Sequence, residues 1–139
     1  DYDVFLTNFA PAFERRVFEM IKVEVVDSLK PVSGKIEGDL TKEIAKRYFE
    51  QVGKIANQNG LNRVITDLRE ASLKADEVDM SELSQELAQL GVSSFYKRAV
   101  VVREDVKGYK QWENHNLSAG HRDMRLFVDH ETAMEWLAE

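Results

Sequence analysis

Short apolar segments typical of buried strands alternate along this chain with stretches of helical periodicity, and this alternation limits the fold more than any other feature. The segments Leu61 to Leu68 and Ala99 to Val102 show little polar alternation, as strands covered on both faces do. A third run, Leu126 to Val128, predicts the last strand. Strands separated by helices form parallel sheets with right-handed crossovers, so the sequence predicts an α/β fold with a mostly parallel sheet.

Two further strands are predicted ahead of the first helix. Apolar and polar residues alternate from Ile21 to Val25 and from Val32 to Ile36, with the period of two of half-buried strands. The pair is close enough in sequence to form an antiparallel hairpin around a turn that contains Pro31. The opening strand should then be an antiparallel edge, and the predicted element order is ββαβαβαβα.

Capping residues predict where the helices of this order begin. Asp39 or Thr41 can cap the first helix. Asp79 and Glu82 have the spacing of a capping box and predict the start of the second helix. Asp129 can cap the terminal helix, which follows the last strand directly.

The first 19 residues are predicted to form an N-terminal extension, and residues 20–139 the domain. Phe5, Phe9 and Phe13 recur every four residues, but Pro11 lies between them and disfavours a long helix. A short helix or docking segment is therefore expected. Its aromatic side chains either cover an edge of the core or form an interface with a partner or a second copy.

Composition excludes several classes of partner and site. The chain has 139 residues, which suits one domain, and no cysteine, so disulfides and thiolate metal sites are excluded. A net charge of −6 argues against nucleic-acid binding, which depends on clustered basic residues. One local basic cluster is interrupted by acidic residues and is expected to be solvated surface, with a phosphate site as the alternative: Arg98, Arg103, Lys107 and Lys110.

Nothing in the sequence predicts a membrane span. The longest purely apolar run of the C-terminal half, Ala99 to Val102, is far too short to cross a bilayer. No secretory signal pattern opens the chain, and the lack of cysteine favours a reducing compartment. A cytoplasmic location is the expectation.

Catalytic motifs are incomplete, and no catalytic residue, metal or cofactor is predicted. His130 and Glu131 begin a sequence similar to the zinc motif H-E-x-x-H, but Met134 stands where the second histidine is needed. His115 and His121 have no obvious third ligand and are expected on the surface. No nucleophile elbow, P-loop or dinucleotide-binding glycine motif is present. The sequence thus predicts a protein that is not an enzyme.

Three sequence stretches stand in the order and spacing of a known family: GKIEGDLTKE at 34–43, VITDLREAS at 64–72 and RLFVDHETAMEWL at 125–137. They contain a glycine and Leu-Thr that open a helix, a strand ending in Asp-Leu, and a closing strand and helix. Over about Met20 to Leu137 the chain resembles SpoIIAA-like proteins, which are related to STAS domains and more loosely to lipid-carrying Sec14-type folds. The resemblance implies βα units wound in one direction, and a role in binding or regulation rather than catalysis.

The resemblance also implies a place for a regulatory phosphate. In the anti-sigma antagonists of this superfamily, a serine in an Asp-Ser-Ser-Gly sequence at a helix start is phosphorylated to control partner binding. The matching stretch here is Asp79-Met80-Ser81-Glu82, in which Met80 stands at the modifiable position. Ser81 is the candidate phospho-switch, because a phosphate beside a helix N-terminus meets unpaired backbone N–H groups. The alternative is that Asp79 and Ser81 only satisfy the donors of the helix start.

Loops beyond the carboxyl ends of the parallel strands are the predicted ligand or partner surface, since open α/β sheets bind ligands there. The polar residues expected at that end are Thr66, Asp67, Arg69, Arg103, Asp105 and Asp129. Their alternative role is loop solvation and helix capping. Tyr109 and Trp112 in the third helix either belong to the core or line an apolar pocket.

Two functions follow from the sequence as alternatives. One is a regulatory or protein-interaction domain, with self-association as its simplest form. The other is a carrier of a small apolar or amphiphilic, lipid-like ligand, which predicts an enclosed apolar cavity. The pathway, the partner and the ligand are not identified by the sequence.

Overall fold

A five-stranded sheet forms the centre of the molecule, which a computed structural model describes over residues 11–27, 29–103 and 107–139. Its strands are β1 (Ile21–Glu24), β2 (Val32–Ile36), β4 (Arg63–Asp67), β6 (Lys97–Val101) and β7 (Met124–Phe127). They lie side by side in the order β1-β2-β4-β6-β7. β1 is antiparallel to β2, and all other neighbours are parallel. The predicted α/β class, the opening hairpin and its place at an edge are confirmed.

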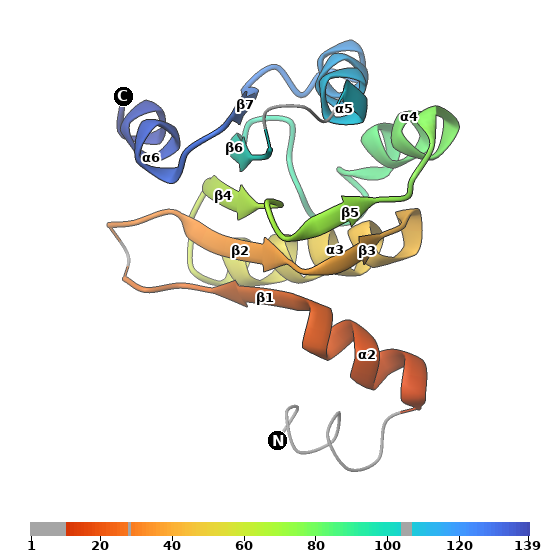
Figure 1. The fold of residues 1–139 in the computed structure, drawn as a ribbon. Helices are drawn as coiled ribbons and strands as arrows, with labels where there is room; N and C mark the ends of the chain where they lie inside the picture. Colours follow the sequence, from red (N-terminus) through yellow and green to blue (C-terminus); the bar gives the residue numbers. More distant parts are fainter. Residues whose placement is uncertain (1–10, 28, 104–106) are drawn as a thin grey trace.

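Helices cover both faces of the sheet (Figure 1). They are α2 (Ala12–Met20), α3 (Lys42–Gln58), α4 (Glu77–Glu86), α5 (Lys107–Ser118) and α6 (His130–Ala138). α3, α4 and α5 contribute buried side chains to one apolar core on one face. α6 lies on the other face, where Ala133 and Leu137 pack against β4 and β6. These two strands are therefore covered on both sides, which explains their nearly continuous apolar sequences.

Two short strands, β3 (Gly38–Leu40) and β5 (Ala71–Leu73), form a separate parallel pair that the predicted element order omits. Strands of this length are too short to show a period of two in the sequence. Gly38 has a φ of 89°, which glycine adopts without strain, and it turns the chain out of β2. Leu40 and Leu73 of this pair pack onto the core.

Capping side chains set the starts of the helices, and one predicted cap is wrong. Thr41 accepts a hydrogen bond from a first-turn N–H of α3 at 3.2 Å, and Asp129 accepts one in α6 at 2.7 Å, as predicted. The cap of α4 is Asp76 instead of Asp79. Asp76 and Asp79 accept hydrogen bonds from each other's backbone N–H groups and so form the capping box. Asp79 stands at the third helical position, where a glutamate is usual. The sequence pattern is therefore compatible with a helix start at either aspartate.

The N-terminal helix α2 follows a proline directly and is joined to α3. Glu14 of α2 forms an ion pair with Arg47 of α3 at 2.6 Å. Of the three predicted aromatic residues, Phe13 lies in α2 with its side chain exposed, and Phe5 and Phe9 lie outside the described residues. The division of the chain into extension and domain stays a prediction.

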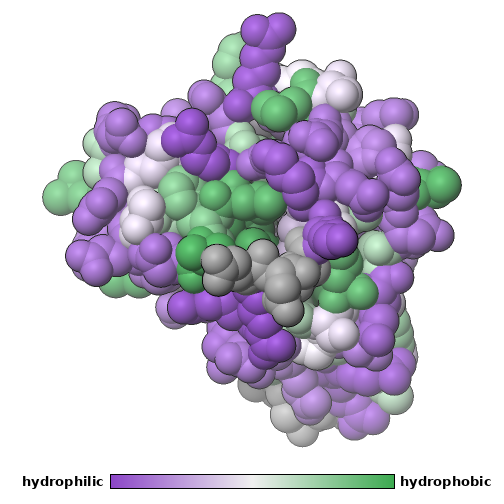
Figure 2. Space-filling view, turned by 45° about the horizontal axis from the view of Figure 1, so that its top comes forward, coloured by the Kyte–Doolittle hydropathy of each residue, from purple (hydrophilic) through white to green (hydrophobic). Residues whose placement is uncertain are grey.

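Hydrophilic side chains cover most of the face in Figure 2, and hydrophobic ones gather mainly near its centre. The most exposed large apolar side chains of the described residues lie in separate loops. Leu29, 94% exposed, lies between β1 and β2, and Phe95, 86% exposed, lies before β6. Single exposed apolar residues of this kind are common on soluble surfaces. Within the described residues, no helix has the length and apolar character needed to span a lipid bilayer.

Candidate functional site

Two charged side chains at the carboxyl end of β4 form an ordered pair at the predicted edge. The Arg69 guanidinium donates to both carboxylate oxygens of Asp67, at 3.1 and 3.0 Å, and the Arg69 backbone N–H donates to Asp67 at 3.0 Å. This fork orients Arg69 although 42% of its side chain is exposed. Partial burial raises the pKa of Asp67, but the hydrogen bonds and charge of Arg69 outweigh it and leave that pKa below its usual value.

Asp129 and Arg103 follow the neighbouring strands at the same end of the sheet. Asp129 comes after β7, and hydrogen bonds from Thr132, with a smaller contribution from the charge of Arg69, lower its pKa. Arg103 is exposed after β6, the strand between β4 and β7. We call Asp67, Arg69, Arg103 and Asp129 the carboxyl-edge cluster. Asp105, predicted at this edge too, lies outside the described residues.

Thr66 does not belong to this surface, contrary to the prediction. Its side chain is 3% exposed and shares a hydrogen bond of 2.6 Å with the Tyr48 hydroxyl of α3. Successive strand residues point to opposite faces, so Thr66 points toward α3 while Asp67 points the other way. Gly34 of β2 makes room for Tyr48, because a Cβ at that position would lie 1.9 Å from the Tyr48 oxygen.

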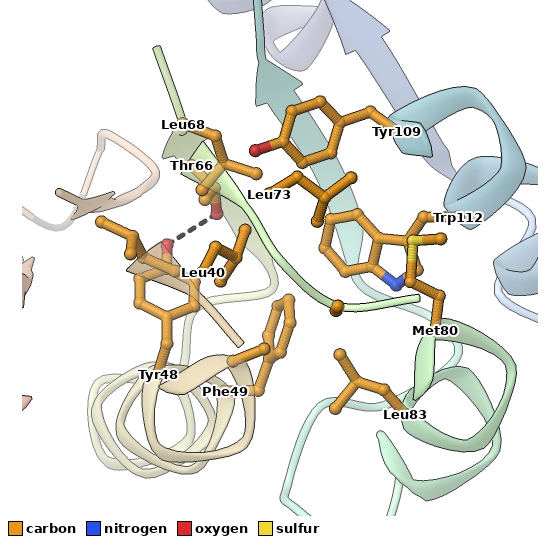
Figure 3. A pocket seen from close by; sticks show the side chains of 13 residues that line it. Leu40, Tyr48, Phe49, Thr66, Leu68, Leu73, Met80, Leu83, Tyr109 and Trp112 are labelled. Atoms are coloured by element: carbon orange, nitrogen blue, oxygen red, sulfur yellow. Dashed lines mark hydrogen bonds between the residues drawn. The ribbon is translucent and has the colours of Figure 1, made fainter. Parts of the chain in front are cut away.

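An apolar pocket lies between the short strands β3 and β5 and the three helices of the larger core (Figure 3). Tyr109 and Trp112 of α5 line it together with Phe49 of α3, and Figure 3 shows Leu73 of β5 beside the two α5 rings. Tyr109 and Trp112 are also core residues, 1% and 4% exposed. The cavity inside the pocket has a volume of only about 20 Å³. That space suits about one water molecule, so the pocket is nearly filled by its own walls.

Two polar atoms of the pocket-lining side chains lack a hydrogen-bond partner within the described part of the chain: the Tyr109 hydroxyl and the Trp112 Nε1. A buried donor without an acceptor is unfavourable. Burial raises the pKa of Tyr109 to about 12 against a smaller opposing effect of Arg103, so the hydroxyl keeps its proton at neutral pH. Both donors are buried within the walls, and the surface that the pocket presents is apolar.

Ser81 lies in the second turn of α4, past the free N–H groups of the helix start. α4 begins at Glu77, and the Met80 N–H already donates to the Asp76 carbonyl at 3.0 Å. The helix start carries Asp76, Glu77 and Asp79, so a phosphate on Ser81 would meet negative charge instead of unpaired donors. The electrostatic argument for a switch therefore fails at this position, and modification of Ser81 stays a prediction. Met80 is 4% exposed and lines the pocket.

A buried cation lies in β6, where the sequence predicts solvated surface. Arg98 is 3% exposed, and burial lowers its pKa to about 10. Its guanidinium donates to Asn116 at 2.8 Å and lies 5.2 Å from the centre of the Phe49 ring. Within the described chain it has no carboxylate partner, and its Nη2 has no hydrogen-bond partner. The period of two in a strand is the sequence signal for this position, since Arg98 stands two residues before Val100 and so shares the inner face of β6 with it.

The two histidines predicted on the surface differ in burial. His115 lies 3.5 Å from Glu77 with part of its side chain exposed. His121 is only 5% exposed, so the prediction is wrong for it. Its backbone N–H donates to the Asn116 carbonyl at 2.9 Å, which holds the loop after α5 against the core. No three residues of the types that hold metal ions come together in the part of the chain that the structure describes.

Comparisons with known proteins identify the fold. No model of a known protein family matches the sequence, and no curated protein matches it. An uncharacterized protein of the DUF3478 family with a SpoIIAA-like fold, from Shewanella loihica PV-4, matches with a TM-score of 0.54 and 18% identity, over 85% of this chain and 93% of that chain. The Bacillus cell fate determinant SpoIIAA, in its phosphorylated form, matches with a TM-score of 0.51 and 12% identity, over 84% of this chain and 98% of that chain.

These identities are low, so the likeness shows the fold alone. It extends over most of both proteins in each comparison, and therefore concerns the whole fold rather than one shared motif. The chain has the SpoIIAA-like fold that its sequence resemblance implies. A fold by itself does not determine a function.

Proposed function

We propose that this chain is a regulatory protein-interaction domain, without catalytic activity, that binds a protein partner through the carboxyl-edge cluster. The observation that carries the proposal is the fork between Asp67 and Arg69, which orients an exposed guanidinium at the rim of the sheet. A side chain that is ordered before binding loses less conformational entropy when a partner contacts it. Arg69 also has more N–H donors than the fork uses, so it can bind a carboxylate of the partner.

The ionisation of the edge carboxylates supports binding over acid–base chemistry. The pKa values of Asp67 and Asp129 are both lowered. A general acid or base that works near neutral pH needs a pKa near that pH. Both side chains are instead anions near Arg69, and Arg103 is exposed after the neighbouring strand β6, so the edge presents both signs of charge. Such a pattern favours one partner over others and steers its approach.

The fold gives separate support for a regulatory role. One of the matching structures is that of a cell fate determinant, and it is in a phosphorylated form. That protein shares the fold over 98% of its own length, which makes regulation by analogy the simplest reading of this chain.

Site-specific photo-crosslinking in cells that make the chain tests the proposal. A benzophenone side chain at position Arg103 should crosslink to one protein of defined mass. The same group at Ser94, exposed in the loop before β6 at the opposite end of the strands, should not crosslink to that protein. The variant Arg69→Glu should abolish the crosslink from position 103 and leave the far-UV circular dichroism unchanged. A crosslink of equal strength from both positions, or one that survives Arg69→Glu, would contradict the proposal.

The pocket favours a second candidate function, a carrier of a small amphiphilic ligand. Once the walls move apart, their apolar side chains would cover such a ligand, and the unpartnered Tyr109 hydroxyl would donate to its carbonyl or carboxylate. The space of about 20 Å³ is far too small for a lipid chain. Carriage therefore requires the walls to move apart.

Tryptophan fluorescence tests the carrier function directly. The chain has two tryptophans, so Trp136→Phe leaves Trp112 as the reporter in the pocket. A carrier should show a saturable change of emission on titration with lauric acid. Adding Tyr109→Phe should weaken the affinity about fivefold, because one hydrogen bond is lost. A titration without a saturable change would remove this candidate.

A further inference from the structure

The two edge strands of the sheet, β7 and β1, differ in what lies on their outer side. At β7, the N–H of Leu126 donates to the Glu113 carboxylate of α5 at 3.1 Å. Glu113 is 8% exposed and α5 packs beside the strand, so another strand cannot pair there. At β1, no strand among the described residues pairs on the outer side.

The pairing of β1 with β2 determines which of its backbone groups face outward. The Glu37 N–H donates to the Met20 carbonyl at 2.8 Å, and Lys22 lies opposite Lys35 in the same ladder. Hydrogen-bonded pairs of an antiparallel ladder recur at every second residue. Met20, Lys22 and Glu24 therefore bond toward β2, and the residues between them do not.

Val23 and Val25 consequently direct their backbone N–H and C=O groups away from the sheet. The Ile21 C=O points the same way, while the Ile21 N–H is satisfied by the Val17 carbonyl at the end of α2. An exposed row of donors and acceptors of this kind is a template for another strand.

The charged side chains of β1 lie on the solvent face. Lys22 and Glu24 are exposed, whereas Val23 packs against the core on the α3 face. Among the described residues, Lys22 and Glu24 take part in no ion pair. Lys22 lies opposite Lys35 instead, and like charges at opposite positions are unfavourable.

A second copy of β1 complements this edge in one register. If two antiparallel β1 strands are centred on Val23, Lys22 of each copy lies opposite Glu24 of the other. Centring on Lys22 or on Glu24 would place two like charges together. In the Val23 register the charged pairs are also the non-hydrogen-bonded pairs, whose side chains lie closest across two antiparallel strands.

We propose that β1 is the interface of a symmetric homodimer in which two sheets join edge to edge through antiparallel β1 strands centred on Val23. The two Val23 residues exchange N–H to C=O hydrogen bonds, and the Val25 N–H of each copy donates to the Ile21 C=O of the other. A pair of short strands is small beside the roughly 1,600 Å² of a standard interface, so the dimer dissociates in the micromolar range. The inference goes beyond the proposed function, because it adds a second partner, another copy of this chain, and leaves the carboxyl-edge cluster free.

Sedimentation velocity of the full chain tests the dimer. Between about 5 and 500 µM the weight-average mass should rise from monomer toward dimer. Val23→Pro should abolish the rise, because proline removes the outward N–H and no bond to β2. The control is Arg125→Glu, which changes an exposed charge on the other edge strand, β7. It should leave the rise of the weight-average mass unchanged.

Charge exchange tests the register. Lys22→Glu and Glu24→Lys should each weaken the dimer about tenfold, because each places like charges opposite one another twice. The double variant should restore dimerisation, and an equimolar mixture of the two single variants should form heterodimers.

A chain that stays monomeric up to about 500 µM would overturn the inference, as would a dimer that survives Val23→Pro. A monomer whose position 103 still crosslinks to another protein would overturn the homodimer and leave the proposed function standing. A dimer whose position 103 does not crosslink to another protein would support the homodimer and contradict the proposed function.

Discussion

At the scale of single residues, we expect His121 to make the stability of the protein depend on pH near neutrality. Burial and the charge of Arg98 lower the pKa of His121 in the folded state, whereas in the unfolded chain that pKa returns to about 6.5. Below this pH the unfolded state binds more protons, so the free energy of unfolding falls as the pH falls. The midpoint of urea unfolding should drop between about pH 7.5 and 5, and His121→Asn should remove most of the drop.

His115, in the helix α5 that precedes the loop of His121, serves as the control. His115→Asn alters a side chain that is partly exposed and should leave the drop in place. The lowered pKa values of Asp67 and Asp129 act in a different window, because their stabilisation is lost only as the pH falls below the usual value of 3.8. A drop of the same size in His121→Asn and in the unchanged chain would refute the role of His121.

Gly34 is the residue at which the smallest change should have a large effect. In Gly34→Ala the new Cβ would lie 1.9 Å from the Tyr48 oxygen, so the ring must move and its hydrogen bond to Thr66 must break. The free energy of unfolding should fall by about 2 kcal/mol or more. Tyr48→Phe, which removes the hydroxyl alone, should cost about 1 kcal/mol. Urea titrations that give Gly34→Ala the smaller loss would contradict this packing.

At the scale of elements, the start of α4 is the sharpest test of the structure against the sequence pattern. Asp76→Ala removes the cap and should reduce the free energy of unfolding by about 1 kcal/mol. Glu82→Ala removes an exposed contact to Lys42 and should reduce the free energy of unfolding by clearly less. If urea denaturation shows a larger loss of stability for Glu82→Ala than for Asp76→Ala, the capping box of Asp79 and Glu82 that the sequence spacing predicts would be the correct one.

The elements that are long or strongly periodic could be predicted from the sequence, and the short ones could not. The hairpin of β1 and β2, the helix α3 and the start of α6 all carry a local signal, either alternation or a cap. β3 and β5 carry none, because strands of three residues are defined by their partner and not by their own sequence. The start of α4 was ambiguous because aspartates stand at both candidate positions.

The candidate site shows the same division. Asp67, Arg69 and Asp129 could be placed at one edge because the carboxyl ends of parallel strands meet there. Thr66, Arg98 and His121 were expected on polar surface because their side chains are polar, yet all three are buried. Which face of a strand or loop is covered depends on helices far away in the sequence, and no local pattern contains that information.

On the scale of the whole molecule, α5 packs beside the edge strand β7, whereas the edge strand β1 pairs with no further strand within the described residues. α3, α4 and α5 fill one face and α6 covers the other, and the pocket between the helices keeps room for about one water molecule. The polar and backbone groups that remain available lie on the outside, at the carboxyl-edge cluster and along β1. On this basis we propose that the chain acts by contacting other protein chains.

Native mass spectrometry of the full chain, purified from its own cells without denaturation, tests that assignment most directly. We expect masses that are sums of polypeptides alone, either two copies of this chain or this chain with another protein. A monomer that retains a small apolar molecule in most of its copies would contradict the account and identify the protein as a carrier.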